Sequence, residues 1–355
     1  MKKIKDMKKS FILLAGAAML FTQACQNSES LYDVSEADSN AIEFSNYVGA
    51  LTRASRAAGN SFQSGDKMQV YGFQIFNEED PNPLLNNQEV ICGSKGTWSY
   101  SPKRYWSDNS SYDFYAIFPY SSNNSFDTDD RVFSVSEFTV QDEAADQTDI
   151  MIAQRIEGRT SHDVVVFVFN HILSNVSFYL KTASDFDTEG IDSIKVLDFD
   201  VTGLYSTGAF AQDGWSDGDA FVGAWTPDEE SVYDMPAVQN VKYVIGAESP
   251  LALAEDLLLL PQDISDDANL YIKYMICYSD DTKSIFTSNV QLNTIKGAKA
   301  SSSDSKETLA SWAPDYRYNY IISVKPDENN AIEFSAQVED WEDEYEAEHI
   351  IGSAE

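Results

Sequence analysis

The stretch VVVFVFNHILSNVSFYLK at 164–181 decides the fold class of this chain. It holds two apolar runs rich in Val and Phe, residue types that favour strands, and each run is too short to cross a membrane as a helix. Many short strands with turn signals and no long segment of helical period predict an all-β fold of one or two β-sandwiches. Comparable runs, separated by clusters of Asn, Asp, Ser and Gly, recur at 68–76, 112–120, 132–140, 191–201, 241–246, 270–279, 284–292 and 316–326.

Only two segments favour a helix, 50–59 and 249–259. The second ends at Pro261 and is equally compatible with a turn that leads into a strand. A mature chain of about 330 residues predicts two domains. We place the boundary in the polar segment 158–162, which gives an N-terminal β-sandwich over 41–160 and a C-terminal one over 161–355.

The N-terminus has the anatomy of an export signal. A basic segment is followed by the apolar run FILLAGAAMLF at 11–21, which is too short for a membrane span. The sequence therefore predicts a signal peptide over 1–24. Cys25 follows Ala after this run, as in a bacterial lipobox, although Thr22 stands where an aliphatic residue is usual. We expect Cys25 to be lipidated and 26–40 to act as a polar tether; the alternative is ordinary cleavage that leaves a free Cys.

Charge excludes one class of partner. The chain has 58 acidic and 24 basic residues, a formal net charge of −34, so nucleic acid would be repelled. This balance fits a self-repelling extracellular surface. Beyond Cys25 the chain has two cysteines, Cys92 and Cys277, both in apolar contexts. A disulfide between them and two buried free thiols both remain open.

Catalytic and metal-binding patterns are absent from the sequence. The three histidines (His162, His171 and His349) form no motif, and we interpret His171 as a core or corner residue that makes a hydrogen bond. The segment 127–133 begins like a calcium loop but lacks its later ligand and glycine, which favours a plain turn. We therefore expect no enzyme activity, no cofactor and no metal. A set of aromatics could stack on sugars, but we favour core packing for them: Trp98, Tyr105, Trp106, Trp215 and Trp225.

Two octets near the ends of the chain agree at six of eight positions: AIEFSNYV at 41–48 and AIEFSAQV at 331–338. Short strands draw on few residue types, so chance is one explanation. The other is that both are core-facing strands on equivalent walls of similar sandwiches. In the first octet, Ile42 and Phe44 stand two residues apart and share one face of a strand.

Several segments, in order and spacing, resemble the Bacteroidia-type fimbrillin family, the subunits of type V pili. They cover most of the mature chain: IEF (42–44), LTRAS (51–55), SFQSGDKMQVYGF (61–73), WSYSPKRYW (98–106), YDFYAIFP (112–119), TDIMIAQ (148–154), FNHILSNVSFYL (169–180), GLYSTGAF (203–210), LLLLPQDI (257–264), WAPDYRYNYIISV (312–324) and IEFSAQVEDWED (332–343).

This resemblance implies two tandem transthyretin-like Greek-key β-sandwich domains in a protein exported as an outer-membrane lipoprotein. It also implies that a surface protease cuts after an arginine behind the first strand, here Arg53 or else Arg56. The first strand, with Ile42, Phe44 and Val48, would then leave a groove that a strand of a neighbouring subunit fills. The donor expected from the family is the extreme C-terminus, here 346–355 with Ile350 and Ile351.

The resulting prediction is a structural, tip or accessory subunit of a cell-surface fimbria that contributes to adhesion. Its expected partners are other fimbrial subunits, the outer membrane through the lipid, and a host or bacterial surface ligand. The alternative is a monomeric surface lipoprotein that binds glycan or host protein through loops. The short C-terminal tail favours a tip or minor subunit among the fimbrial roles.

Overall fold

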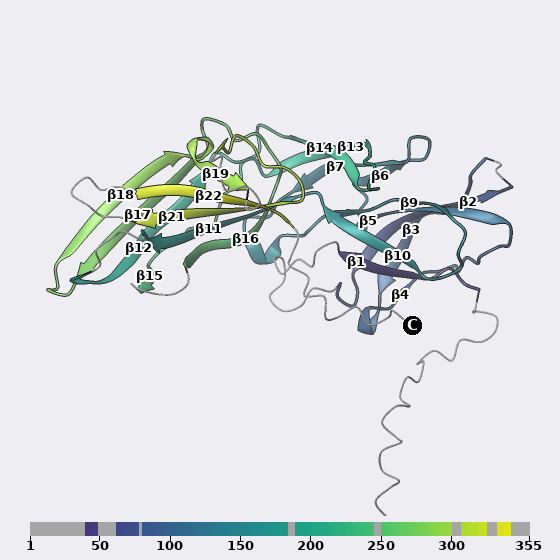
Figure 1. Ribbon diagram of the computed structural model, residues 1–355, viewed down its shortest axis with the longest axis horizontal. Helices are drawn as coiled ribbons and strands as arrows, with labels where there is room; N and C mark the ends of the chain where they lie inside the picture. Colours follow the sequence, from purple (N-terminus) through teal and green to yellow (C-terminus); the bar gives the residue numbers. More distant parts are fainter. Residues whose placement is uncertain are drawn as a thin grey trace, which may run out of the picture. The chain divides into compact units, whose positions relative to one another are not determined.

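The computed structural model describes residues 40–48, 62–77, 80–183, 189–244, 250–299, 307–324 and 332–341. These residues form 22 strands and three single-turn 3-10 helices, Ser94–Gly96, Ala144–Asp146 and Leu292–Thr294. The all-β prediction is therefore confirmed (Figure 1). Within the described part of the chain, no helix is long and apolar enough to span a membrane.

The first sheet carries the strands nearest the N-terminus. Its order is β1 (Phe44–Val48), β10 (Val165–His171), β8 (Met151–Ala153), β5 (Ser110–Phe118), β2 (Lys67–Phe76), β3 (Asn82–Cys92) and β4 (Trp98–Ser99), and β9 (Ile156–Arg159) pairs with β5. The second sheet has four strands, in the order β14 (Phe221–Pro227), β13 (Thr207–Trp215), β7 (Val132–Thr139) and β6 (Asn124–Asp127).

The third and fourth sheets come mainly from later residues. The third has the order β16 (Leu251–Leu259), β11 (Ser174–Thr182), β21 (Tyr316–Val324), β22 (Ile332–Asp340), β19 (Lys296–Lys299) and β20 (Glu307–Thr308). The fourth has the order β15 (Val241–Val244), β12 (Ile191–Thr202), β17 (Asn269–Tyr278) and β18 (Lys283–Gln291).

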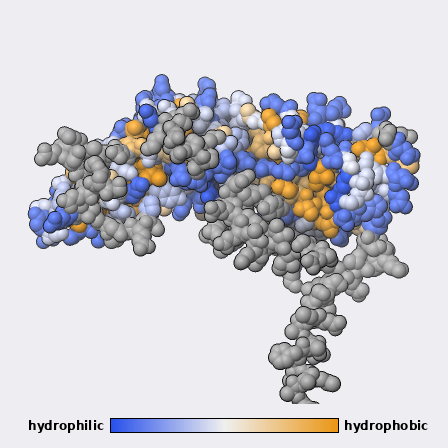
Figure 2. All heavy atoms as spheres, viewed as in Figure 1, coloured by the Kyte–Doolittle hydropathy of each residue, from blue (hydrophilic) through white to orange (hydrophobic). Residues whose placement is uncertain are grey.

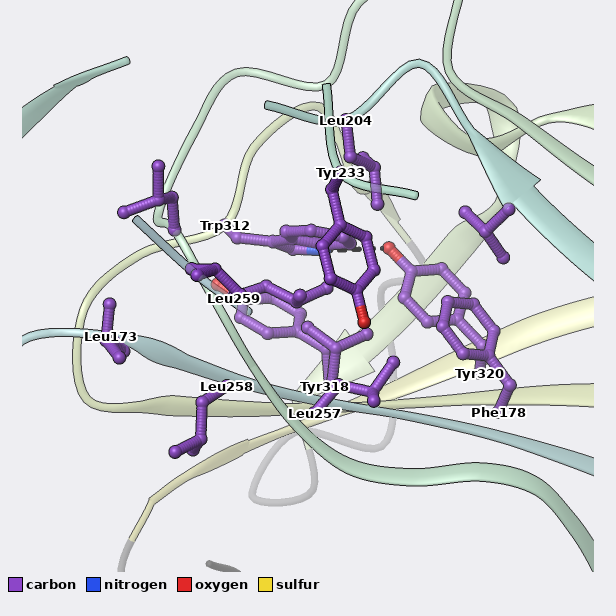
Figure 3. Packing of buried hydrophobic residues seen from close by; sticks show 14 of the residues in the cluster. Leu173, Phe178, Leu204, Tyr233, Leu257, Leu258, Leu259, Trp312, Tyr318 and Tyr320 are labelled. Carbon is purple, nitrogen blue, oxygen red and sulfur yellow. Dashed lines mark hydrogen bonds between the residues drawn. The ribbon is translucent and has the colours of Figure 1, made fainter. Parts of the chain in front are cut away.

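The four sheets pack as two sandwiches. The first and second sheets meet through aromatic side chains, with the Tyr115 and Phe126 ring centroids 5.2 Å apart. The third and fourth sheets meet where Phe178 of β11 lies 5.5 Å from Phe199 of β12. Figure 3 shows the packing around Phe178, which also stacks on Tyr320 at 5.1 Å. Alternating residues of each strand therefore enter the core, as the period-two pattern requires.

Polar groups of the buried aromatic side chains form hydrogen bonds within this core. The indole Nε1 of Trp312 donates to the Tyr320 hydroxyl at 2.9 Å, drawn as a dashed line in Figure 3. Burial raises the pKa of Tyr320 and of Tyr233, so both hydroxyls stay protonated at neutral pH. On the surface, blue polar residues predominate over orange ones in the face that Figure 2 shows, in keeping with the charge of −34.

A second apolar cluster lies on the other face of the first sheet. We call it the inner cluster. It includes Ile42, which precedes β1, Phe44 of β1, and residues of β2, β3, β4, β5, β8 and β10. In β10, Val165, Phe167 and Phe169 enter this cluster, while Val166 and the preceding Val164 are 48% and 43% exposed. The stretch that decides the fold class therefore alternates strictly in its first half.

Most of the segment 249–259 forms the strand β16, Leu251–Leu259, so the helix suggested there is wrong. β16 pairs antiparallel with β11, which buries Leu253 and Leu257. Asp256 has φ of 57°, a left-handed conformation that a helix does not accept. Cross-strand pairing and burial therefore override the helix preference of its Leu and Ala residues. The other suggested helix, 50–59, lies outside the described residues.

The two octets do not occupy equivalent places, which corrects the second explanation for their likeness. β1 ends the first sheet and runs parallel to β10. β22 lies inside the third sheet, antiparallel to β21 and parallel to β19. Phe44 is 5% exposed, whereas Phe334 is half-buried and packs against the hydrophobic core that contains Phe178 and Tyr320. The shared residues therefore stand in two different settings, with different strand partners and different burial of the shared phenylalanine.

Strand pairing crosses the boundary predicted at residue 160. β10 follows that residue yet pairs with β1 and β8, and β13 pairs with β7. β10 then passes into β11 of the third sheet after only Ile172 and Leu173. A division of the chain at residue 160 would split the first and second sheets. The domain extents 41–160 and 161–355 remain a prediction.

Candidate functional site

β1 is an edge strand whose backbone completes one side of β10. The two strands run parallel, in a register that pairs Phe44 with Val165 and Val48 with Phe169. Just before β1, the carbonyl of Glu43 accepts a hydrogen bond from the Val165 N–H at 2.8 Å. On its other side, β10 pairs with β8 only from Phe169 to His171. The first half of β10 therefore depends on β1 for its strand pairing.

The other side of β1 contacts the segment that follows β4. The Ile42 N–H donates to the Arg104 carbonyl at 2.8 Å, and the Tyr100 hydroxyl donates to the Ile42 carbonyl at 2.9 Å. Further along, the indole Nε1 of Trp98 donates to Asn46 Oδ1 at 2.8 Å. Since Trp98 belongs to β4, these bonds join the two ends of the first sheet. β1 therefore closes a gap between β10 and 98–104.

Aromatic side chains form the floor beneath β1. The Phe44 ring stacks on Phe167, with centroids 5.6 Å apart and planes 14° apart, and it meets the edge of Phe114 at 5.9 Å. The centroid of the Tyr100 ring lies 5.4 Å from that of Phe44. Ile42 is fully buried and Phe44 is 5% exposed. Burial of each of these side chains contributes roughly 1.5–3 kcal/mol to holding the strand.

We call this arrangement the β1 groove: β10 and 98–104 are its walls, and Phe114, Phe167 and Tyr100 its floor. Burial raises the pKa of Tyr100, so its hydroxyl is a donor at neutral pH and can bond the strand's carbonyl. The chemistry that the groove offers is backbone pairing along β10 plus an apolar floor for alternate side chains. This is the pattern that accepts an extended polypeptide.

Some residues predicted from sequence lie in the β1 groove, and others lie outside the described residues. Ile42 and Phe44 enter the inner cluster. Val48 is placed by its backbone pairing with Phe169, and its side chain lies outside what the structure describes. Cys25, Arg53, Arg56, Ile350 and Ile351 all lie outside the described residues.

Sequence reasoning did not assign Tyr100, Arg104, Phe114 and Phe167 to the groove. The signal was present in the aromatic-rich segment WSYSPKRYW at 98–106, which stood out without a role. Core packing is confirmed for the three tryptophans Trp98, Trp106 and Trp225, which are 4–8% exposed. Tyr105 is 46% exposed, so core packing is wrong for it, whereas Trp215 is partly buried and packs against the core.

His171 lies in the core, in agreement with its interpretation. It is fully buried, its Nδ1 lies 2.7 Å from Asp149 Oδ2, and its ring stacks on Trp341 at 3.8 Å. Its backbone N–H donates to Asp315 Oδ1 at 3.2 Å. Burial raises the pKa of Asp315, and the hydrogen bond from the His171 backbone N–H opposes that shift. This cluster ties the β10–β11 junction to the ends of β21 and β22.

The remaining candidates also have structural assignments. Cys92 and Cys277 are free thiols, Cys92 buried and Cys277 half-buried, so the disulfide alternative is wrong. The segment 127–133 holds the turn that joins β6 to β7, as interpreted: Asp127 Oδ1 accepts the N–H groups of Asp129 and Asp130, and these bonds lower the pKa of Asp127. Among the described residues, no group of three or more His, Cys, Asp or Glu side chains is placed to hold a metal ion.

Comparisons with known proteins agree with this fold. A crystal structure of a fimbrial protein from Bacteroides vulgatus ATCC 8482 is 18% identical over 85% of this chain and 99% of its own, with a TM-score of 0.55. A fimbrilin (fimA) from Porphyromonas gingivalis W83 is 10% identical over 85% of this chain and 98% of its own, with a TM-score of 0.40. At 18% identity, the likeness to the Bacteroides vulgatus protein shows a shared fold. None of the curated proteins compared with the chain matches it.

A model of the fimbrillin-like family matches residues 52–341, which is most of the chain. The match spans all the strands from β2 to β22 and begins after β1 ends at Val48. The chain belongs to the fimbrillin-like family.

Proposed function

We propose that this chain is a structural, tip or accessory subunit of a cell-surface fimbria and that it assembles by strand exchange. One observation carries the proposal: β1 is a short edge strand that fills the β1 groove, and Phe44 together with the preceding Ile42 is buried in the cluster that contains the floor. Its removal would leave one side of β10 unpaired above an aromatic floor. An exposed edge of that kind recruits a strand from another chain.

Release of β1 needs a cut between β1 and β2. In the sequence, Arg53 and Arg56 both follow Val48, where β1 ends, and precede Lys67, where β2 begins. A protease specific for arginine would separate the strand from the body of the protein at either residue. The strand would then be held only by its noncovalent contacts.

The incoming strand must reproduce what β1 supplies. It would run parallel to β10, place apolar side chains at the positions of Ile42 and Phe44, and offer a carbonyl to Tyr100. We propose the C-terminal segment of a neighbouring subunit as the donor, with Ile350 and Ile351 as the corresponding side chains. A tip subunit would receive such a strand without donating its own.

The proposed route to the surface begins with signal peptide 1–24 and lipidation of Cys25. The lipid would anchor the precursor in the outer membrane, and 26–40 would be the tether that cleavage later removes. A fimbrial role needs no cofactor and no catalytic residue, and we propose that the chain is not an enzyme. Its contribution to adhesion would come through the assembled fimbria.

Limited digestion with an arginine-specific protease tests this function. We expect an early cut with a new N-terminus at Ala54 or Ala57, loss of the fragment that carries β1, and then oligomers or filaments in electron micrographs. The double variant Arg53→Lys/Arg56→Lys keeps both charges and should neither be cut there nor assemble. Cutting without assembly would indicate a tip subunit, which a partner with a free donor strand should then extend. If Arg155 is cut first while 49–61 resists, strand exchange is rejected in favour of a monomeric surface-binding protein.

A further inference from the structure

Asp315 contacts the β10 backbone at the end of the β1 groove, on the side that faces β1. In an antiparallel pair, alternate residues direct both backbone groups toward the partner strand. Toward β8, the β10 segment uses its even-numbered residues. The Val168 carbonyl accepts a hydrogen bond from the Gln154 N–H at 2.7 Å. The Ile172 N–H donates to the Ile150 carbonyl at 3.0 Å. The odd-numbered residues of β10 therefore direct their backbone groups toward β1.

The pairing with β1 follows this alternation. The Val165 N–H donates to the Glu43 carbonyl at 2.8 Å, and in a parallel ladder every second residue of β10 repeats that bond. The described pairing with β1 reaches Phe169. The next N–H on this side belongs to His171, and it donates to Asp315 Oδ1 at 3.2 Å. A carboxylate oxygen therefore takes the place that the carbonyl of a continuing strand would need.

Several contacts fix Asp315 at this position. Its Oδ2 accepts a hydrogen bond from Asn170 Nδ2 at 3.3 Å. Its backbone N–H donates to the Leu173 carbonyl at 3.1 Å, and its carbonyl accepts from the Trp341 N–H at 2.9 Å. The Trp341 ring is buried and stacks on His171. Asp315 has φ of 64°, a left-handed conformation that Asp tolerates better than most residues. The carboxylate is therefore held against the end of β10 from both of its oxygens and from its own backbone.

We propose that Asp315 is a register stop for the strand that fills the β1 groove. This inference rests on the proposed strand exchange and adds where the incoming strand must end: it pairs with β10 from Val165 to Phe169 and no further. A strand that slides by two residues keeps the same side chains on the floor, because the side-chain period is two. The occupied His171 N–H excludes that slide toward the end of β10. Asp315 therefore selects one register where side-chain alternation alone would also accept a shifted one.

Hydrogen exchange at the His171 amide tests the stop directly. The chain is cut behind β1 and the fragment is removed, which gives what we call the stripped protein, and NMR follows the exchange of single amides. We expect the Phe167 and Phe169 amides to lose their protection, because their acceptors belong to β1. The His171 amide should stay protected, because its acceptor is Asp315. A His171 amide that loses protection together with Phe169 overturns the proposal.

Two variants separate the carboxylate from the backbone conformation at this position. Asp315→Gly suits the left-handed backbone and removes the acceptor, whereas Asp315→Asn suits it equally and keeps an amide oxygen for the His171 N–H. In Asp315→Gly, the His171 amide should exchange about tenfold faster or more, because it loses a hydrogen bond to a charged group. Asp315→Asn is the matched control and should restore most of the protection.

Peptides of two lengths then measure where the strand must end. Amidated peptides with the sequences of 41–48 and 41–50 are bound to the stripped parent and to both stripped variants. The parent and Asp315→Asn should bind the two peptides equally tightly. Asp315→Gly should bind the longer peptide about 2- to 12-fold more tightly, the equivalent of one backbone hydrogen bond, and the longer peptide should restore protection of the His171 amide. Because the two affinities are compared on one protein, a general loss of stability cancels.

The outcomes separate the stop from strand exchange itself. A stripped parent that binds neither peptide refutes strand exchange, and the stop fails with it. A parent that binds both peptides but prefers the longer one overturns the stop alone. An Asp315→Gly variant that binds both peptides and gains no preference for the longer one also overturns the stop and leaves strand exchange standing.

Discussion

Replacement of Phe44 by alanine tests how the β1 groove holds its strand. Phe44 is 5% exposed and contacts the rings of Phe167, Phe114 and Tyr100. Removal of a phenyl group packed in this way costs about 3–5 kcal/mol. Since about 1.4 kcal/mol corresponds to a factor of ten in an equilibrium constant, the cut strand should be held at least 100-fold more weakly.

The assay follows the strand after the chain has been cut behind it. Wild type and Phe44→Ala are nicked with an arginine-specific protease, and native mass spectrometry records how fast the N-terminal fragment leaves. We expect the fragment to leave Phe44→Ala at least 100-fold faster, because most of the lost binding energy raises the dissociation rate.

The second octet supplies the matched control. Phe334 has the same neighbours in sequence but lies in β22, inside the third sheet. Phe334→Ala should lower the free energy of unfolding while leaving the release of the fragment unchanged. Release of the fragment at the wild-type rate from Phe44→Ala would refute the role of the aromatic floor. An equal acceleration in Phe334→Ala would show that the effect reflects general loss of stability.

Three further predictions concern single contacts. Asn46→Ala removes the hydrogen bond that Asn46 accepts from the β4 indole, and a buried donor left unpaired costs about 1–3 kcal/mol, so the nicked fragment should leave roughly 5- to 150-fold faster. Gly203→Ala would place a Cβ 2.3 Å from the Asp267 carbonyl oxygen at φ of 77°, whereas Gly190→Ala at φ of 76° meets nothing within 4 Å. Urea unfolding should show a loss of about 1 kcal/mol for Gly190→Ala and a clearly larger loss for Gly203→Ala; equal losses would contradict the clash. Burial raises the pKa of Asp315, so its contribution to stability is full below the unfolded carboxyl pKa of about 3.9 and is lost as pH rises through the folded pKa. Asp315→Asn should therefore lose less stability than wild type as pH rises from about 4, and parallel pH profiles would contradict this assignment.

The strands were predictable because their signal is local. In β10, Val165, Phe167 and Phe169 are buried, whereas Val166 and the preceding Val164 are exposed, which follows from the period of a strand. The segment 249–259 was ambiguous for the opposite reason. Its Leu and Ala residues suit a helix, and only pairing with β11, a partner distant in sequence, makes it a strand.

The walls of the β1 groove could not be read from the sequence, although Ile42 and Phe44 could be placed on one face of a strand. Tyr100 and Arg104 contact β1 only because the first sheet brings its two ends together, and residues about 60 positions apart then share hydrogen bonds. The octets show the same limit. Their likeness was visible at once, but an edge strand and an internal strand can carry the same residues, and only the partners on each side distinguish them.

Uptake of a synthetic strand by the cleaved protein tests the central claim most directly. A fluorescent peptide with the sequence of 41–48 is added to intact and to arginine-cleaved protein, and binding is followed by fluorescence anisotropy and native mass spectrometry. Strand exchange predicts that one peptide binds per cleaved molecule as the original fragment leaves, and that the intact protein and a peptide with alanine in place of Phe44 bind far more weakly. A cleaved protein that keeps its fragment under all native conditions, or that loses it and binds no peptide, would contradict the account.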